Sequence, residues 1–286
     1  MTDFKTDKIL SGELHRLAAF SSDPSGGNPA GVWVGDRIPE PAAMQQIASN
    51  VGYSETAFLA PASGFERTIR YYSPEKEIAF CGHATIAAGV LVGESGGDGA
   101  YHFASSVGAI AVTVRSENGQ RQASLTSVEP TTKAAPQKLI EQALVCLGWK
   151  SAELDNTIPP ILAYAGVWHL VLAAAEAKRL ATLDYDYENL KTLMLGEDIT
   201  TLQLVWRERR DLFHARNPFP VGGVVEDPAT GAAAAALGGY LRSGGLLKPP
   251  ATFIILQGEG MGRPSRLLVH VPIQGGIIVS GTAVHL

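Results

Sequence analysis

The stretch Phe80-Cys81-Gly82-His83-Ala84-Thr85-Ile86 opens the segment that decides the fold. Residues 84–92 are small or apolar on every side and carry no charge. Because a helix that is apolar all round is buried, this segment predicts a helix surrounded by other elements. A strand-like run at 77–80 leads into Gly82-His83, and such a junction presents backbone N–H groups and the positive end of a helix dipole, which suits a carboxylate or phosphate. The same residues would also form an ordinary helix cap with a packed histidine.

A second junction of the same kind is Val225-Glu226-Asp227-Pro228-Ala229-Thr230-Gly231-Ala232-Ala233-Ala234. A polar turn precedes a predicted helix at 230–241, in which five consecutive alanines permit close packing against strands. Asp227 fits an N-cap or an acid/base group, while Thr230 and Gly231 offer hydroxyl and amide donors. An ordinary core helix capped by Asp or Thr fits equally well. Two such junctions in two similar halves favour a shared cleft.

The remaining segments alternate in a way that predicts mostly strands. Strands are expected at 14–19, 31–34, 56–60, 65–73, 101–105, 109–115, 121–127, 160–163, 167–174, 202–207, 212–216, 252–257, 266–272 and 277–281. Helices are expected at 39–50 and 137–147, and Asn118-Gly119 predicts a hairpin turn. Residues 129–136 lack periodicity and contain two prolines, which predicts a linker. Runs of strands with isolated helices indicate the α+β class.

Charge and composition exclude several classes of protein. The net charge is −5, and a mildly acidic protein is a poor match for nucleic acids or anionic membranes. No apolar run approaches the roughly 18 residues of a membrane span. The polar stretch 1–7 lacks signal-peptide features, and two cysteines are too few for a disulfide framework. We therefore expect a cytoplasmic protein with neither a membrane nor a nucleic-acid partner.

Two further segments carry polar groups next to apolar strands. Glu55 precedes the expected strand 56–60, and burial there would raise its pKa and fit it for general acid/base work. A solvated loop glutamate is the alternative interpretation. Asn28 lies in the turn 27–32, which is explained equally well as a turn and nothing more.

Five motifs in a fixed order together resemble a known family. They are Gly27-Asn28-Pro29-Ala30-Gly31-Val32, Ser54-Glu55-Thr56-Ala57-Phe58, Cys81-Gly82-His83-Ala84-Thr85, Asp227-Pro228-Ala229-Thr230-Gly231 and Gln257-Gly258-x-x-Met261-Gly262-Arg263-Pro264-Ser265. The chain resembles the PhzF-like family of phenazine biosynthesis, within the diaminopimelate-epimerase-like superfamily. The resemblance covers nearly the whole chain.

The resemblance implies an α+β fold of two pseudo-symmetric domains. Each would be a curved mixed sheet wrapped around a central helix, with the active site between the domains. We assign the domains to residues 1–127 and 128–274, and we expect the strand in 275–286 to return to the first domain. The resemblance also implies a homodimer.

The resemblance further implies an isomerase that needs no cofactor and acts on a small carboxylate-bearing metabolite. The family enzyme of phenazine synthesis acts on trans-2,3-dihydro-3-hydroxyanthranilate. The general acid/base glutamate of that enzyme matches Glu55. Its active-site histidine matches His83, and its active-site aspartate matches Asp227. The expected substrate-binding residues are Asn28, Gly82, Thr230, Gly231 and Ala232. Ala232 stands where the family has a serine, which removes a hydroxyl from the expected pocket and weakens the case for the phenazine substrate.

Two other functions stay open. The epimerase branch uses two cysteines, one before each central helix, and only Cys81 falls near such a place. Cys146 lies in another predicted helix, so a two-thiol racemase is disfavoured and Cys81 is interpreted as a packed residue. A racemase or epimerase that pairs Glu55 with Cys81 remains an alternative. Another is a non-catalytic binding protein, which Ala232 would favour.

No metal or cofactor is expected. The seven histidines are scattered, without the paired spacing of metal ligands. The glycines at 258–262 do not have the G-x-G-x-x-G spacing of a dinucleotide site, and the segment after them predicts a strand rather than a helix.

Overall fold

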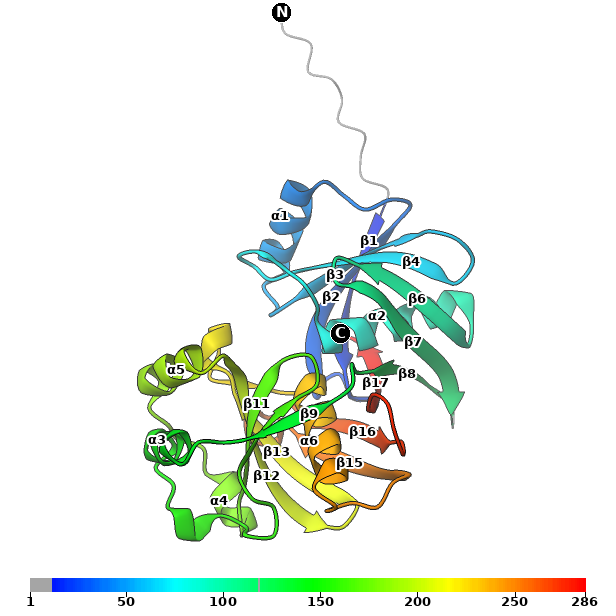
Figure 1. Ribbon diagram of the computed structural model, residues 1–286. Helices are drawn as coiled ribbons and strands as arrows, with labels where there is room; N and C mark the ends of the chain where they lie inside the picture. Colours follow the sequence, from blue (N-terminus) through cyan, green and yellow to red (C-terminus); the bar gives the residue numbers. More distant parts are fainter. Residues whose placement is uncertain (1–11, 118) are drawn as a thin grey trace, which may run out of the picture.

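The computed structural model describes residues 12–117 and 119–286. The polar stretch 1–7, and Asn118 of the predicted hairpin turn, lie outside the described residues. The described chain forms α-helices α1 to α6 and a 17-stranded sheet, so the expected mixed, sheet-rich architecture is confirmed (Figure 1). None of the described helices combines the length and the apolar character that crossing a bilayer requires.

One set of strands closes into a ring. In ring order these are β1 (Gly12–Ala19), β2 (Asn28–Gly35), β3 (Thr56–Pro61), β4 (Glu66–Tyr72), β6 (Gly99–Ser105), β7 (Gly108–Glu117), β8 (Gln120–Thr126) and β17 (Ile278–His285), and β17 pairs again with β1. Helix α2 (Gly82–Gly96) contacts β1, β2, β3, β7, β8 and β17. Helix α1 (Pro41–Val51) packs against β3 and β4 in a separate apolar cluster, so it covers the sheet from outside.

The predicted buried helix is confirmed as α2. Every residue from His83 to Gly93 is buried. A Cβ at Gly89 would lie 2.8 Å from the side chains of Ala123 and Val112, and one at Gly93 would lie 2.5 Å from Val114. Strands β7 and β8 therefore approach the helix too closely for any side chain at these two glycines.

A second set of strands surrounds α6 (Gly231–Ser243). In order these are β9 (Thr131–Ala134), β10 (Ile161–Tyr164), β11 (Trp168–Ala173), β12 (Ile199–Arg209), β13 (Leu212–Pro218), β15 (Ala251–Gln257), β16 (Ser265–Val271) and again β17. Helix α6 contacts β9, β10, β11, β12, β16 and β17. The remaining helices are α3 (Gln137–Leu147), α4 (Ala177–Ala181) and α5 (Tyr187–Gly196), whose buried residues share an apolar cluster with β10, β11 and β12.

Part of the predicted linker 129–136 forms a strand that the sequence did not predict. Residues 131–134 pair antiparallel with β10. All four side chains of this strand are exposed, and prolines stand at 130 and 136. A strand this short, with no alternation between buried and exposed positions, leaves no periodic signal in the sequence.

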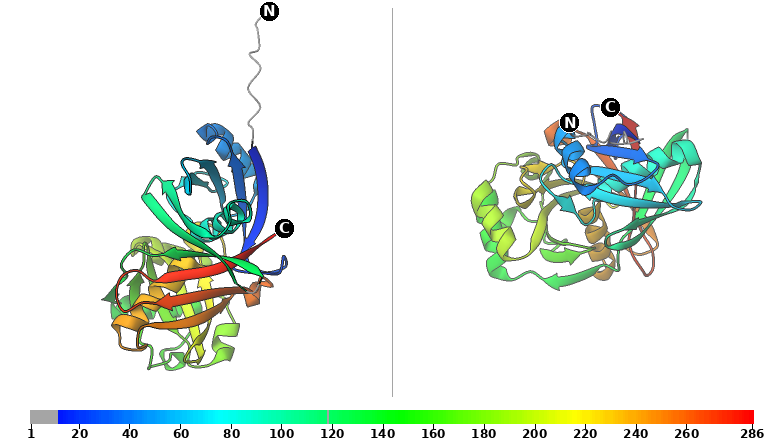
Figure 2. Two further views of the ribbon diagram at one scale, coloured as in Figure 1. Left: turned by 90° about the vertical axis from the view of Figure 1, so that its right-hand side faces the viewer. Right: turned by 90° about the horizontal axis from the view of Figure 1, so that it is seen from above.

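Strand β17 belongs to both sets of strands. It pairs with β16 through residues 278–280 and with β8 through residues 278–282, and then with β1 through residues 283–285 (Figure 2). The neighbours from β1 to β8 pair in the series antiparallel, parallel, antiparallel, parallel, antiparallel, antiparallel, and the neighbours from β10 to β17 repeat this series. The division into two domains at residue 127 stays a prediction.

Candidate active site

The N-terminal end of α2 carries the first group of predicted site residues. The two-residue strand β5 (Glu77–Ile78) leads to Cys81, which is the N-cap in extended conformation and makes no side-chain cap hydrogen bond. Gly82 and His83 form the first turn, where N–H groups have no partner within the helix. His83 is buried, with 6% of its surface exposed. The junction predicted from the sequence is therefore present.

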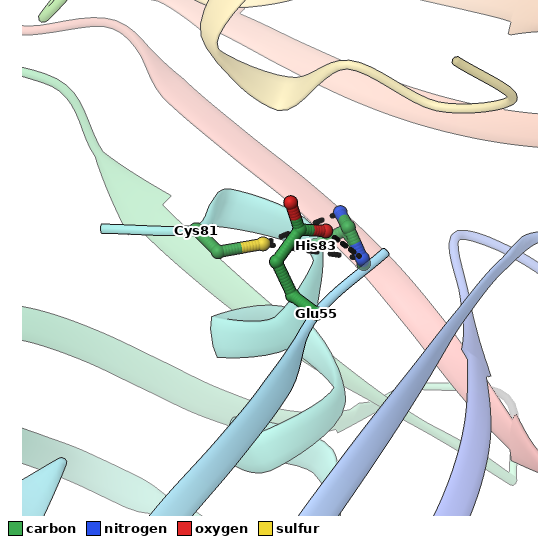
Figure 3. A group of neighbouring side chains, drawn as sticks. All are labelled: Glu55, Cys81 and His83. Atoms are coloured by element: carbon green, nitrogen blue, oxygen red, sulfur yellow. Dashed lines mark hydrogen bonds and ion pairs between the residues drawn. The ribbon is translucent and has the colours of Figure 1, made fainter. Parts of the chain in front are cut away.

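Glu55 reaches this end of α2 from the segment before β3. The N–H of Gly31 on β2 donates to the Glu55 carbonyl at 3.1 Å, which fixes the backbone beside the sheet. The Glu55 Oε2 lies 3.3 Å from the Nε2 of His83. The Cys81 Sγ lies 3.4 Å from the Nδ1 of His83, so the three side chains converge (Figure 3).

The Cys81 thiol is not set up as a nucleophile. Burial raises its pKa well above the ordinary value, and the nearby carboxylates of Glu55 and Asp227 raise it further. A reactive cysteine instead has its thiolate stabilised by positive surroundings. The interpretation of Cys81 as a packed residue therefore has physical support.

The second predicted group gathers around Asp227, on the short strand β14 (Glu226–Asp227) before α6. The Asn28 Nδ2 donates to Asp227 Oδ1 at 2.8 Å, across 199 positions of sequence. The Thr230 hydroxyl donates to Asp227 Oδ2 at 2.6 Å. Both carboxylate oxygens thus accept a hydrogen bond, which fixes the plane of the carboxyl group.

Burial raises the pKa of Asp227 to about 6. The His83 ring and the hydrogen bonds from Thr230 and Asn28 act in the opposite direction, and the Glu55 carboxylate acts with burial. Because His83 and Glu55 both affect this carboxyl group, the two helix ends share one electrostatic environment. Strongly shifted carboxyl groups of this kind are typical of functional sites.

The two helix ends also share a cavity. Its walls include Gly82 and Ile86 of α2, and Gly231, Ala232 and Ala235 of α6. A Cβ at Gly82 would come no closer than 4.0 Å to Phe80, and one at Gly231 no closer than 3.7 Å to Phe20. Both glycines therefore open into space rather than into packed protein. Of the predicted site residues, Gly82, Gly231 and Ala232 line this cavity. Asn28, Glu55, His83, Asp227 and Thr230 gather at the same two helix ends without being among its walls, and the roles of all these residues stay predictions.

Gln257 is a site residue whose role the sequence did not indicate. It is 1% exposed at the end of β15. Its Nε2 donates to the Asp227 carbonyl at 2.8 Å and to the Thr230 hydroxyl at 3.0 Å, and its Oε1 accepts from the Thr230 N–H at 3.3 Å. With this acceptor position occupied, the Thr230 hydroxyl hydrogen is directed to Asp227. The only signal was that Gln257 begins a recognised motif.

Phe20, which lines the cavity, is a second residue whose role the sequence did not indicate. It is 1% exposed and has a φ of 65°, a left-handed conformation that is rare for a bulky residue. Its N–H donates to the Thr282 carbonyl at 2.7 Å, and its carbonyl accepts from the Arg266 N–H at 2.8 Å. Its ring forms part of the cavity wall beside Gly231. Backbone strain of this kind clusters at functional sites, where tertiary contacts hold it in place, and nothing in the sequence around 20 foretells it.

The raised pKa of Asp227 predicts that the stability of the fold depends on pH. Its pKa of about 6, against an ordinary 3.8, means that the native state holds this proton more tightly than the unfolded chain. Its stabilising contribution is therefore complete below about pH 4 and is lost as the pH rises through 6, on the order of 3 kcal/mol. Relative to Asp227→Asn, the wild type should lose free energy of unfolding between pH 4 and pH 7 in urea titrations. The exposed Asp184→Asn is the control, and a difference that stays constant with pH would contradict the prediction.

Comparisons with known proteins bear on the chemistry. A family model described as phenazine biosynthesis-like protein, PhzC-PhzF, matches residues 17–286. A Bacillus subtilis protein named as an uncharacterized isomerase is 27% identical, with 96% of each chain covered. The trans-2,3-dihydro-3-hydroxyanthranilate isomerase of Pseudomonas fluorescens is 31% identical, with 87% of this chain and 86% of that enzyme covered. The crystal structure of a PhzF-family phenazine biosynthesis protein of Bacillus anthracis has a TM-score of 0.85 at 22% identity, with 98% of both chains covered.

Proposed function

Because the chain belongs to the PhzC-PhzF family of phenazine biosynthesis-like proteins, it is a PhzF-like isomerase, and we propose that it moves a proton on a small carboxylate-bearing metabolite without a cofactor. The observation that carries the proposal is the contact of Glu55 with His83 at the end of α2, in one electrostatic environment with Asp227. A carboxylate, an imidazole and a second carboxyl group are sufficient for general acid/base chemistry.

In the proposed reaction, Glu55 removes a proton from an sp³ C–H and returns it elsewhere on an allylic or α-carbonyl system. His83, 3.3 Å from Glu55, orients the substrate and assists the proton relay. Asp227 would orient the substrate from the α6 side, because its own carboxyl group is held by Asn28 and Thr230. A single base that takes and returns the proton on one face needs no partner on the other face.

Negative charge that develops on the substrate would be stabilised by the two helix ends. Each end presents backbone N–H groups, at Gly82-His83 and at Gly231-Ala232, and a partial charge of roughly half a unit. Fixed donors and dipoles in a water-poor pocket stabilise such charge strongly. The cavity between the ends has a volume of about 50 Å³, room for one or two water molecules or a carboxylate group. We therefore assign the substrate carboxylate to this cavity, and a larger ring would require its walls to move.

The epimerase alternative that pairs Glu55 with Cys81 has less support. A two-base epimerase needs its bases on opposite faces of one carbon, roughly 6–7 Å apart if each lies about 3–3.5 Å from it. The ligand atoms of Glu55 and Cys81 lie within 4.8 Å of one another. No carbon fits between them, so the geometry favours the isomerase over this epimerase.

We further propose the two pseudo-symmetric domains that the resemblance implies. The support is the repeated series of strand pairings, with a short strand and a helix, β5 and α2 or β14 and α6, at the same place in each series. The homodimer and the cytoplasmic location stay predictions.

Solvent deuterium exchange tests the function. The chain is incubated in D₂O with a panel of cyclic and amino-acid carboxylates, including hydroxyanthranilate-like acids. Exchange without inversion of configuration is expected and supports the isomerase. Exchange with inversion would support an epimerase instead, and binding without exchange would identify a non-catalytic binding protein.

Ala232→Ser tests which acid the cavity accepts. Ala232 lines the cavity, so the added hydroxyl should be tolerated and should donate to a bound acid. One neutral hydrogen bond stabilises by about 0.5–1.5 kcal/mol, so the affinity for 3-hydroxyanthranilate should rise about 2- to 10-fold. Isothermal titration measures it, and Ala177→Ser on the exposed face of α4 is the control. An unchanged or weaker affinity would mean that the substrate carboxylate lies elsewhere.

A further inference from the structure

Cys81 is the member of the site that the proposed proton transfer leaves unused. Its Sγ lies 3.4 Å and 3.9 Å from the two ring nitrogens of His83. The Nε2 of His83 lies 3.3 Å from Glu55 Oε2, and one ligand atom from each of the three residues lies within 4.8 Å of the others (Figure 3). Within residues 12–117 and 119–286, this is the one group of three potential metal-ligand side chains so closely spaced.

Two of the three spacings are close to those around a tetrahedral zinc ion. Zinc binds thiolate sulfur at about 2.3 Å, imidazole nitrogen at about 2.0–2.1 Å and carboxylate oxygen at about 2.0–2.2 Å. Tetrahedral angles then separate the ligand atoms by roughly 3.3–3.6 Å. The observed 3.3 Å between His83 Nε2 and Glu55, and 3.9 Å between His83 Nε2 and Cys81, differ from this range by a few tenths of an ångström at most. The ligand atoms of Glu55 and Cys81 lie within 4.8 Å of one another, so metal binding would draw this pair closer together.

The kind of ligand also selects the cation. Sulfur and imidazole ligands favour Zn²⁺, Co²⁺ or Cu²⁺, whereas Mg²⁺ and Ca²⁺ favour sets of oxygen ligands. The positive end of α2 opposes a cation here. The negative carboxylates of Glu55 and Asp227 offset this effect of the helix end. Both lie close enough to Cys81 to shift the pKa of its thiol. A metal ion can reach the site from solvent at Glu55, because 17% of the Glu55 side chain is exposed against 7% of the His83 side chain.

We propose that Cys81, His83 and Glu55 form an inhibitory site for Zn²⁺, with three protein ligands and water in the fourth position. On binding, the Cys81 thiol releases its proton to solvent and its sulfur forms the bond to the metal. The Glu55 oxygen that would accept the substrate proton is then coordinated, so turnover stops until the metal leaves. The binding site stands on geometry alone, and only its inhibitory effect rests on the proposed function.

Cobalt absorption tests the site without any substrate. Co²⁺ bound to a thiolate gives an intense charge-transfer band, so wild-type protein titrated with Co²⁺ should show this band at one metal per chain, and Zn²⁺ should abolish it. Cys81→Ala should lose the band, and Cys81→Ser should do so with less change in volume. Cys146→Ala should keep it, because Cys146 lies on α3 in a different apolar cluster. A wild type without the band, or a Cys81→Ala protein that keeps it, would overturn the proposal.

Inhibition is the second measurement, made with the acid found by deuterium exchange. Zn²⁺ should inhibit the wild type reversibly, with activity restored by a chelator. Cys81→Ala should need at least about 10-fold more Zn²⁺, since even the partners of metal ligands alter affinity by about 10–100-fold. Cobalt binding without exchange of any acid would contradict the isomerase and leave the metal site. If an acid exchanges deuterium but the protein shows neither inhibition by zinc nor a cobalt band, the metal site is contradicted and the isomerase proposal still stands.

Discussion

Glu55→Gln should lower turnover at least about 100-fold, the usual contribution of one general acid/base group. The amide keeps the size of the carboxyl group and can still hydrogen-bond to His83, 3.3 Å away in the wild type. It has no basic oxygen able to take a proton from carbon, so the loss should appear in kcat. The affinity for 3-hydroxyanthranilate should change by no more than about 10-fold, since one neutral hydrogen bond contributes about 0.5–1.5 kcal/mol.

Steady-state rates, deuterium exchange and isothermal titration measure these effects. Glu75→Gln removes an exposed carboxylate of the same chain and should leave all three unchanged. If Glu55→Gln retained near-wild-type turnover, Glu55 would not be the base. If it lost affinity as strongly as turnover, Glu55 would be a binding residue instead.

Gly231→Val should weaken the binding of 3-hydroxyanthranilate by at least about 100-fold. The valine side chain would project into the cavity between the two helix ends and keep a carboxylate from the N–H groups of α6. Loss of two hydrogen bonds to a charged group, at about 1.5–3 kcal/mol each, exceeds a factor of 100. The fold should survive, because the nearest atom to a Cβ at this position is the Phe20 ring at 3.7 Å.

A graded series separates binding from stability. Gly231→Ala should weaken binding less than Gly231→Val, and both should melt within a few degrees of the wild type. Gly89→Ala is the contrasting variant, because its Cβ would lie 2.8 Å from Ala123 and Val112 and should lower the melting temperature. A Gly231→Val protein that is folded and binds normally would exclude the α6 end from the site.

Periodicity and composition predict much of this fold. The helix expected at 137–147 has those bounds as α3, and the charge-free segment 84–92 lies within the buried helix α2. Both signals are local, because they depend on residues within a few turns of one another. Strand β9 was missed since its stability comes from backbone pairing with β10, about 30 positions away, while its own side chains are exposed.

Only part of the candidate site could be predicted from the sequence. Taken alone, Glu55, His83 and Asp227 each had an ordinary explanation, and only the resemblance of five motifs in order joined them. The network around Asp227 depends on Asn28 and Gln257, which are 199 and 30 positions away from it, so it exists only once the sheets are assembled. Phe20 depends on contacts with Thr282 and Arg266, and a strained backbone conformation leaves no composition signal.

Strand β17 has a consequence for how the chain reaches this structure during synthesis. It follows every other described strand in the chain, yet it seals the ring between β8 and β1 and also ends the second sheet. Until it leaves the ribosome, β1, β8 and β16 each have an open edge, and the apolar surface of α2 that β17 covers is exposed to water. Contacts between β1 and β17 span most of the chain, and pairings of such long range form slowly. The final strand therefore sets the end of a vulnerable period in which the nascent protein is prone to aggregation and open to chaperones.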